Sequence, residues 1–113
     1  MTRCAARQTD RVRDLNDAFR QSFVGGRVVV TGGTRDLSDE DRLALFKAVK
    51  TFDAFTPDND PYGEHDFGSL ELGGDRFFWK LDCYDLHCLG HSPDPADPSV
   101  TTRVLTIMRA EEY

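Results

Sequence analysis

The sequence has few cysteines, no long apolar run and little positive charge in its second half. The three cysteines, Cys4, Cys83 and Cys88, are an odd number and lack the spacing of a disulfide framework. No segment reaches membrane-spanning length, and the N-terminus lacks the apolar core of a signal peptide. We therefore expect reduced cysteines, no membrane association and a cytoplasmic location.

Positive charge is scarce in one half only. Residues 51–113 carry four Lys/Arg against thirteen Asp/Glu, a net −9, whereas residues 1–50 carry ten against seven, a net +3. Because neutralising phosphates requires Lys and Arg, this balance argues against direct nucleic-acid binding by the second half. It fits a metal site, a basic protein partner or mimicry of a polyanion, and it equally fits a solvated acidic surface.

The 113 residues are enough for one domain, whose core the eight Phe, three Tyr and one Trp would fill. We expect a flexible tail over residues 1–9 and a single domain over residues 10–113. Thr9 is the expected N-cap of a helix with charged residues such as Asp17 and Arg20 in solvent. Its apolar stripe consists of Val12, Leu15, Phe19 and Phe23.

The remaining patterns alternate between strand and helix. The β-branched run at residues 27–31 predicts a strand buried on both faces, and Gly32-Gly33 predicts a turn. A second helix is expected from its N-cap Ser38 to about residue 53, followed by strands over residues 67–72, 76–84 and 101–109. The order α-β-α-β-β-β predicts an α+β domain with a four-stranded, mostly antiparallel sheet and two helices packed on one face.

One face of this sheet is a candidate binding surface. Alternation along residues 76–84 turns Phe77, Trp79, Leu81 and Cys83 toward the helices. It puts Phe78, Lys80, Asp82 and Tyr84 on the opposite face, beside Ser69 and Glu71. Mixed aromatic and charged side chains there suit an interface or a shallow pocket. Alternatively, the loop of residues 86–99 folds over this face.

The main candidate site is the loop of residues 56–68, which prolines and glycines fix between a helix and a strand. We expect no cofactor; the alternative is a divalent metal, for which this loop supplies oxygen and nitrogen ligands. Those candidate ligands are Asp58, Asp60, Glu64, His65 and Asp66. A calcium-loop pattern is incomplete, because Ser69 occupies its twelfth position. In a structural interpretation, Asx turns hold the loop and His65 is a hydrogen-bonded linchpin.

Catalysis would make His65 a general base oriented by a carboxylate, with Glu64 as the other candidate catalytic residue. No catalytic set is complete in the sequence, so an enzyme is not the favoured interpretation. A second cluster has zinc-ligand side chains but lacks the two spaced knuckles of structural zinc sites. Its members are Cys83, His87, Cys88 and His91.

Three runs together resemble a known family: LNDAFR with GGRVV in residues 15–29; FDAFTPDNDP with GEHDFG in residues 52–68; and RFFWK, DPADP and TRVLTIM in residues 76–108. They are similar to the small bacterial family catalogued as domain of unknown function 3768, over about residues 10–113. The resemblance implies an alphaproteobacterial protein, often encoded on plasmids or other mobile elements, with an accessory role such as plasmid maintenance, conjugation or countering host defence. It implies no established activity. The Cys83 cluster departs from the family pattern.

Three hypotheses about function follow. The first is a protein-binding or inhibitory module that engages an unidentified protein partner, one form being an inhibitor of a nucleic-acid-binding host system. Its binding residues would be Asp58, Asp60, Asp66, Phe78, Lys80, Asp82 and Tyr84. The second is a small metal-dependent, hydrolase-like enzyme that uses residues 58–66. In the third, the loop residues are purely structural. The sequence does not predict an oligomeric state.

Overall fold

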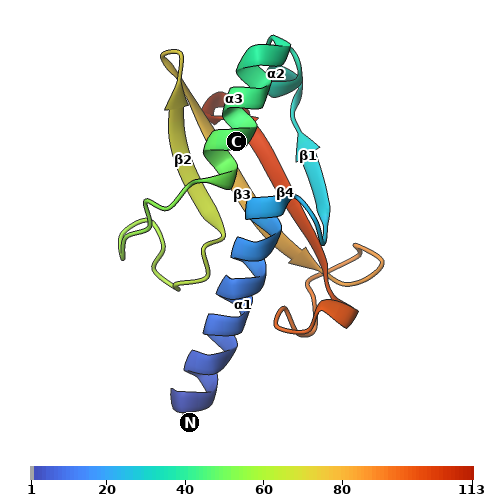
Figure 1. Ribbon diagram of the computed structural model, residues 1–113. Helices are drawn as coiled ribbons and strands as arrows, with labels where there is room; N and C mark the ends of the chain where they lie inside the picture. The colour runs from blue at the N-terminus through green and yellow to red at the C-terminus, as the bar shows by residue number, and fades with distance from the viewer. Residues whose placement is uncertain (1) are drawn as a thin grey trace.

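The computed structural model describes residues 2–113, and the side chains of residues 8–113. Helices α1 (Thr2–Ser22) and α3 (Asp39–Lys50) lie on one face of a four-stranded sheet (Figure 1). The strands are β1 (Arg27–Val30), β2 (Phe67–Leu72), β3 (Asp75–Tyr84) and β4 (Thr102–Arg109). The predicted α+β class is confirmed, with one addition: a single-turn helix, α2 (Gly32–Arg35), stands where a plain turn was expected.

The sheet is mixed, in the order β1-β4-β3-β2. Strands β2 and β3 form the expected hairpin through Gly73 and Gly74, both with positive φ as a tight hairpin turn requires. Strand β4 runs antiparallel to β3, whereas β1 runs parallel to β4. The two halves of the chain are thus joined by the β1–β4 pair at the sheet edge.

Strand β1 corrects one prediction, because it is an edge strand and is not buried on both faces. It pairs with β4 alone, and the helices cover only one side of it. Val28 and Val30 pack against the core on that side, while Val29 is 46% exposed on the other. The three consecutive valines of β1 therefore belong to a strand that is buried on one face only.

The start of helix α1 also differs from the prediction. The helix begins at Thr2, so Thr9 lies within it and is not its N-cap; Met1 lies outside the described residues. Val12 and Phe19 are buried, as the apolar stripe predicted. Asn16 between them and Arg20 directly after Phe19 are also buried, each at most 2% exposed, so the face that α1 turns to the protein includes polar side chains.

The start of α3 follows the prediction. The Ser38 hydroxyl accepts a hydrogen bond from the backbone N–H of Asp41, and three acids occupy the first turn. The core between α1, α3 and the sheet is built around Trp79, which is fully buried. Gly68 on β2 lies against the Trp79 ring so closely that a Cβ there would come within 2.5 Å of Cε2.

The second face of the sheet is partly covered by the end of the chain. Tyr113 packs edge-on against Phe67 and Phe78, with ring centroids 6.0 and 5.6 Å away. The loop of residues 86–99, the covering segment that the sequence suggested, instead lies beside α1: Arg11 donates to the carbonyl of Ala96 at 3.1 Å. In residues 2–113 no helix has the length and apolar character to cross a membrane.

Candidate functional site

The loop between α3 and β2 is fastened to α1 through His65. Its Nδ1 atom lies 2.9 Å from a carboxylate oxygen of Asp17, and its Nε2 atom lies 3.5 Å from Asp60 Oδ2. The backbone N–H of His65 also donates to Asp60 at 3.2 Å. His65 has a φ of +53°, a conformation that costs a non-glycine residue on the order of 1–3 kcal/mol, and these contacts hold it there. Asp17 thus engages Nδ1 of the ring, while Nε2 faces Asp60 without a hydrogen bond to it.

Two more side chains complete this fastening. The Phe55 ring stacks on the imidazole of His65, with centroids 3.7 Å apart and planes 3° from parallel. Arg20 donates to Asp17 at 3.0 Å and to the carbonyls of Val49 and Phe52, both at 2.9 Å. Those carbonyls lie at the C-terminal end of α3, where helical partners run out and a cation is favourable. The geometry thus supports the linchpin interpretation of His65.

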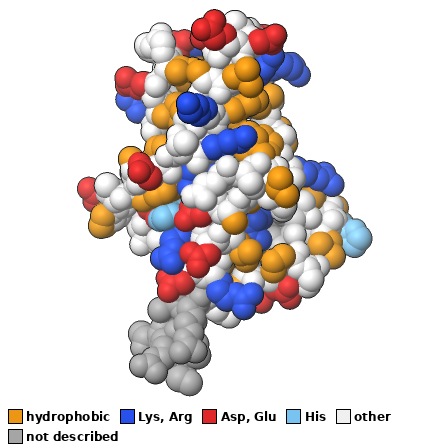
Figure 2. Space-filling model, in the orientation of Figure 1, with side chains coloured by type: hydrophobic (Ala, Val, Ile, Leu, Met, Phe, Trp, Pro, Cys, Tyr) orange, Lys and Arg blue, Asp and Glu red, His pale blue; other side chains and the backbone are white. Residues whose placement is uncertain are grey.

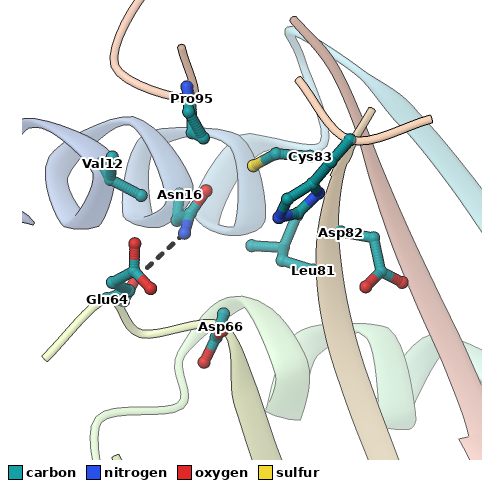
Figure 3. Close-up of a pocket in the computed structure, with 9 residues that line it drawn as sticks. Val12, Asn16, Glu64, Asp66, Leu81, Asp82, Cys83 and Pro95 are labelled. Carbon is teal, nitrogen blue, oxygen red and sulfur yellow. Dashed lines mark hydrogen bonds between the residues drawn. The ribbon is translucent and has the colours of Figure 1, made fainter. Parts of the chain in front are cut away.

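A cavity of about 130 Å³ lies next to the loop that His65 attaches to α1, at an interruption in the pairing of β3. Ladder pairing of β3 with β2 ends at Lys80 opposite Phe67, and Tyr84 forms an isolated bridge with His91. Between these points the Leu81 N–H still donates to the Asp66 carbonyl at 2.8 Å, and the Cys83 carbonyl accepts from the Ser92 N–H at 3.0 Å, so the gap in the pairing is short. We call the cavity the notch. Its lining consists of Val12, Asn16, Glu64, Asp66, Leu81, Asp82, Cys83, His91 and Pro95 (Figure 3).

The notch has one wall held by hydrogen bonds of Asn16 and one buried thiol, Cys83. Asn16 donates to the Glu64 carbonyl at 2.9 Å and accepts from Arg103 Nε at 3.0 Å, so α1, the loop and β4 are locked together. The Cys83 sulfur points from β3 toward α1 in Figure 3. Burial raises the pKa of the Cys83 thiol, which disfavours the nucleophilic thiolate.

Glu64 is one of the two carboxylates of the notch whose pKa is raised, the other being Asp66. Burial raises the pKa of the Glu64 carboxyl group, and the negative charges of Asp66 and Asp60 raise it further, while His91 opposes the shift. Among the described residues, no side chain donates a hydrogen bond to the carboxylates of Glu64 or Asp66, and neither forms an ion pair; the backbone N–H of Asp66 is the one donor to its own carboxylate. The notch therefore holds negative charge, half-buried at Glu64 and exposed at Asp66, with His91 as the basic side chain of its lining.

Two further hollows adjoin the notch and extend it into a groove. One, of about 280 Å³, shares Val12, Glu64 and Pro95 with the notch and adds Asp94. The other, of about 370 Å³, shares Asp66, Leu81 and Asp82 and reaches the second face of the sheet. We call these three cavities together the acidic groove, after Glu64, Asp66, Asp82 and Asp94. Figure 2 shows the face of the molecule that carries the helices, where acidic and basic side chains are interspersed beside α1.

The structure does not assemble the five predicted metal ligands into one site. Asp60 faces His65, Glu64 and Asp66 line the notch, and Asp58 is exposed and lines none of these cavities. In the part of the chain that is described, no three His, Cys, Asp or Glu side chains are placed to hold a metal ion together. The same holds for the Cys83 cluster, in which Cys83 is buried and Cys88 is exposed.

The predicted binding residues on β3 occupy the second face, as the alternation required. Phe78 lies opposite Ser69, and Lys80 forms an ion pair with Asp82 at 3.4 Å. Lys80 and Asp82 line the groove, whereas Tyr84 does not. Sequence reasoning missed Asp17, Asn16, Asp94 and Tyr113 as site residues. Asp17 and Asn16 could have been suspected only from their helical spacing to the buried stripe.

The fold and the cavities together define a small α+β domain with an acidic groove beside its first helix. Residues 30–112 match the model of the family described as Protein of unknown function (DUF3768), which is well over half of the chain. The chain belongs to this family, and the resemblance seen in the sequence is confirmed. No curated protein and no solved structure matches the chain.

Proposed function

We propose that this protein is a binding module whose acidic groove receives a positively charged segment of another protein. The observation that carries the proposal is the half-buried Glu64 carboxylate, which among the described residues accepts no side-chain hydrogen bond and forms no ion pair, with only His91 as a basic side chain in the lining around it. Keeping an uncompensated charge out of water is unfavourable. A cationic group from a partner would compensate it and gain a charge-assisted hydrogen bond.

The dimensions of the notch favour the end of a side chain over a metabolite. Pockets for small ligands commonly enclose about 300–1,000 Å³ and surround most of the ligand. The notch, of about 130 Å³, has room for the end of one long side chain. Its apolar walls, Val12 and Leu81, suit the methylene stem of Lys or Arg, with Glu64 beside them to meet the charged end.

The short gap in the pairing of β3 bears on how an extended segment would bind. On the side of the notch the pairing of β3 is interrupted between the Leu81 N–H, which donates to the Asp66 carbonyl, and the Cys83 carbonyl, which accepts from the Ser92 N–H. An extended peptide that crosses this short gap would gain few backbone hydrogen bonds there, so its side chains in the flanking pockets would supply most of the recognition. A peptide with basic residues at alternate positions would place them toward the notch and the hollows beside it.

The charge of the chain agrees with a partner that itself binds nucleic acid. Such partners present clustered Lys and Arg, which the net −9 of residues 51–113 would attract over several ångströms. In that case the carboxylates of the groove stand where phosphates would bind. An inhibitory accessory role of the kind expected from mobile elements is the form of the proposal that this chemistry supports best.

The proposal is tested by titrating a synthetic peptide of alternating lysine and serine into isotope-labelled protein and recording NMR spectra. We expect saturable binding that weakens as salt screens the charges, and a loss of about three- to tenfold for Glu64→Gln or Asp94→Asn. Asp58→Asn is the matched control, because Asp58 is an acid of the same loop outside the groove. Absence of saturable binding, or an equal loss in the control, would refute the proposal.

A further inference from the structure

One part of the groove has a chemistry that the acids alone do not explain. The hollow of about 370 Å³ on the second sheet face is bordered by three aromatic residues, Tyr62, Phe67 and Tyr113. The two tyrosines are 78% and 74% exposed, so neither contributes much to the core. Large exposed aromatic side chains of this kind are enriched where proteins bind other molecules. We call this cavity the aromatic hollow.

Two of these rings form a corner. The planes of Phe67 and Tyr113 meet at 82°, with centroids 6.0 Å apart, and Phe78 buttresses both of them from beneath at 5.2 and 5.6 Å. The η2 turn (Ala110–Glu112) places Tyr113, because the Glu112 carboxylate accepts hydrogen bonds from Thr31 and from the backbone of Gly33. Aromatic surface is thus held over the sheet by a fixed attachment.

The remaining polar border of the aromatic hollow is predominantly negative. Asp66 and Asp82 both line it, and Lys80, also in the lining, forms an ion pair with Asp82 at 3.4 Å. This leaves Asp66 as the carboxylate without an ion-pair partner among the described residues. Aromatic faces attract cations through their negative π-surface, and a nearby carboxylate adds direct pairing.

We propose that the aromatic hollow is a recognition site for an arginine side chain of the partner. A guanidinium is planar, so it can stack on an aromatic ring while its edge donates two parallel hydrogen bonds to one carboxylate, here Asp66. A lysine ammonium is a more strongly hydrated point charge and gains less from stacking. The inference rests on the proposed function, because it names the side chain by which the basic segment is recognised next to the notch.

The test uses the intact protein and a single blocked amino acid, N-acetyl-arginine N-methylamide, titrated by NMR. We expect weak, saturable binding with a Kd in the millimolar range, and shifts confined to Tyr62, Phe67, Tyr113 and Asp66. The uncharged isostere N-acetyl-citrulline N-methylamide should bind at least about tenfold more weakly, and the lysine analogue should also bind more weakly. Equal binding of the citrulline compound, or of the lysine analogue, would overturn the inference.

Variants separate the aromatic contribution from general charge. Tyr62→Leu and Tyr113→Leu should each weaken arginine binding by about two- to fivefold, while Tyr84→Leu, a tyrosine of β3 outside the hollow, should not. If arginine instead shifts Val12 and Asn16, it binds in the notch; this would overturn the inference and leave the proposed function standing. If the lysine–serine peptide fails to bind while arginine still shifts the aromatic residues, the proposed function fails and the arginine site stands.

Discussion

His65 and Asp17 are 48 residues apart in the sequence, and His65 Nδ1 lies 2.9 and 3.0 Å from the two carboxylate oxygens of Asp17. The same carboxylate accepts from Arg20, which is 1% exposed and also caps the end of α3. Asp17 therefore connects α1 to the candidate-site loop directly and to α3 through Arg20. The position of the acidic groove depends on Asp17 and Arg20. Arg20 holds the start of the loop through the carbonyl of Phe52, and Asp17 holds its end through His65, next to Glu64 and Asp66.

The first prediction concerns this connection. Asp17→Asn removes the charge that faces both His65 and the buried guanidinium of Arg20, so we expect the free energy of unfolding to fall by about 1–3 kcal/mol. Urea unfolding measures it as a lower midpoint at constant slope. Asp14→Asn is the control, since Asp14 lies on the same helix and pairs only with the partly exposed Arg13. A variant as stable as the control would contradict the role of Asp17.

The sequence predicted this fold well where periodic patterns are strong. The apolar stripe of α1, the N-cap Ser38 and the alternation of β3 each appear at the expected residues, because each reflects a local repeat or a local hydrogen bond. The parallel pairing of β1 with β4 was not predictable in this way. It joins residues 27–30 to residues 104–107, and no local signal distinguishes an edge strand of valines from a buried one.

The candidate site was less predictable, because its residues come together only through tertiary contacts. Arg20 reads as a solvent-facing helix residue, yet it is buried against carbonyls of α3 and the ring of Trp79. The acidic loop was identified as the site, but its acids point in different directions: Asp60 toward His65, Glu64 into the notch. Spacing along a chain shows which ligands are near one another, and not which way they face.

The second prediction uses the pH dependence of stability. The pKa of Glu64 in the folded protein is raised above its usual value of 4.5, chiefly by burial. The unfolded chain then releases this proton first, so stability falls as the pH rises from about 4.5 through the folded pKa. Glu64→Gln removes the ionisation. We expect the variant to be more stable than the wild type at neutral pH, with the difference vanishing below about pH 4.

Melting temperatures of wild type and Glu64→Gln across this pH range provide the measurement. Asp58→Asn controls for the loss of one negative charge, because Asp58 lies in the same loop but outside the notch. A stabilisation that is equally large at every pH would show that it arises from packing or overall charge, and not from the buried carboxylate.

The third prediction tests the close approach of β2 to the core. A Cβ at Gly68 would overlap the ring of the fully buried Trp79, so Gly68→Ala should destabilise the protein by about 1–3 kcal/mol or more. Trp79 is the single tryptophan of the chain, so its fluorescence reports both unfolding and displacement of the ring. Gly32→Ala is the control: its Cβ would meet only Arg35 Nη2, at 3.7 Å, and should change stability by no more than about 0.5 kcal/mol. Equal stability of the two variants would show that the sheet adjusts freely at Gly68.

The last prediction concerns the attachment of the C-terminal turn. Hydrogen bonds from the Thr31 hydroxyl, at 2.6 Å, and from the Gly33 N–H, at 3.0 Å, lower the pKa of Glu112. A lowered folded pKa means that the attachment is complete above the usual value of 4.5 and is lost as the pH falls through the folded pKa. We expect the amide resonance of Gly33 to follow this titration, and resonances of Tyr113 to move with it as the ring leaves Phe67 and Phe78.

Glu112→Gln should abolish the titration at Gly33, whereas Glu111→Gln, a change of the neighbouring exposed acid, should preserve it. A Gly33 midpoint at or above 4.5 in the wild type would show that Glu112 is not held by these donors, and Tyr113 would then need another reason to stand at the border of the aromatic hollow.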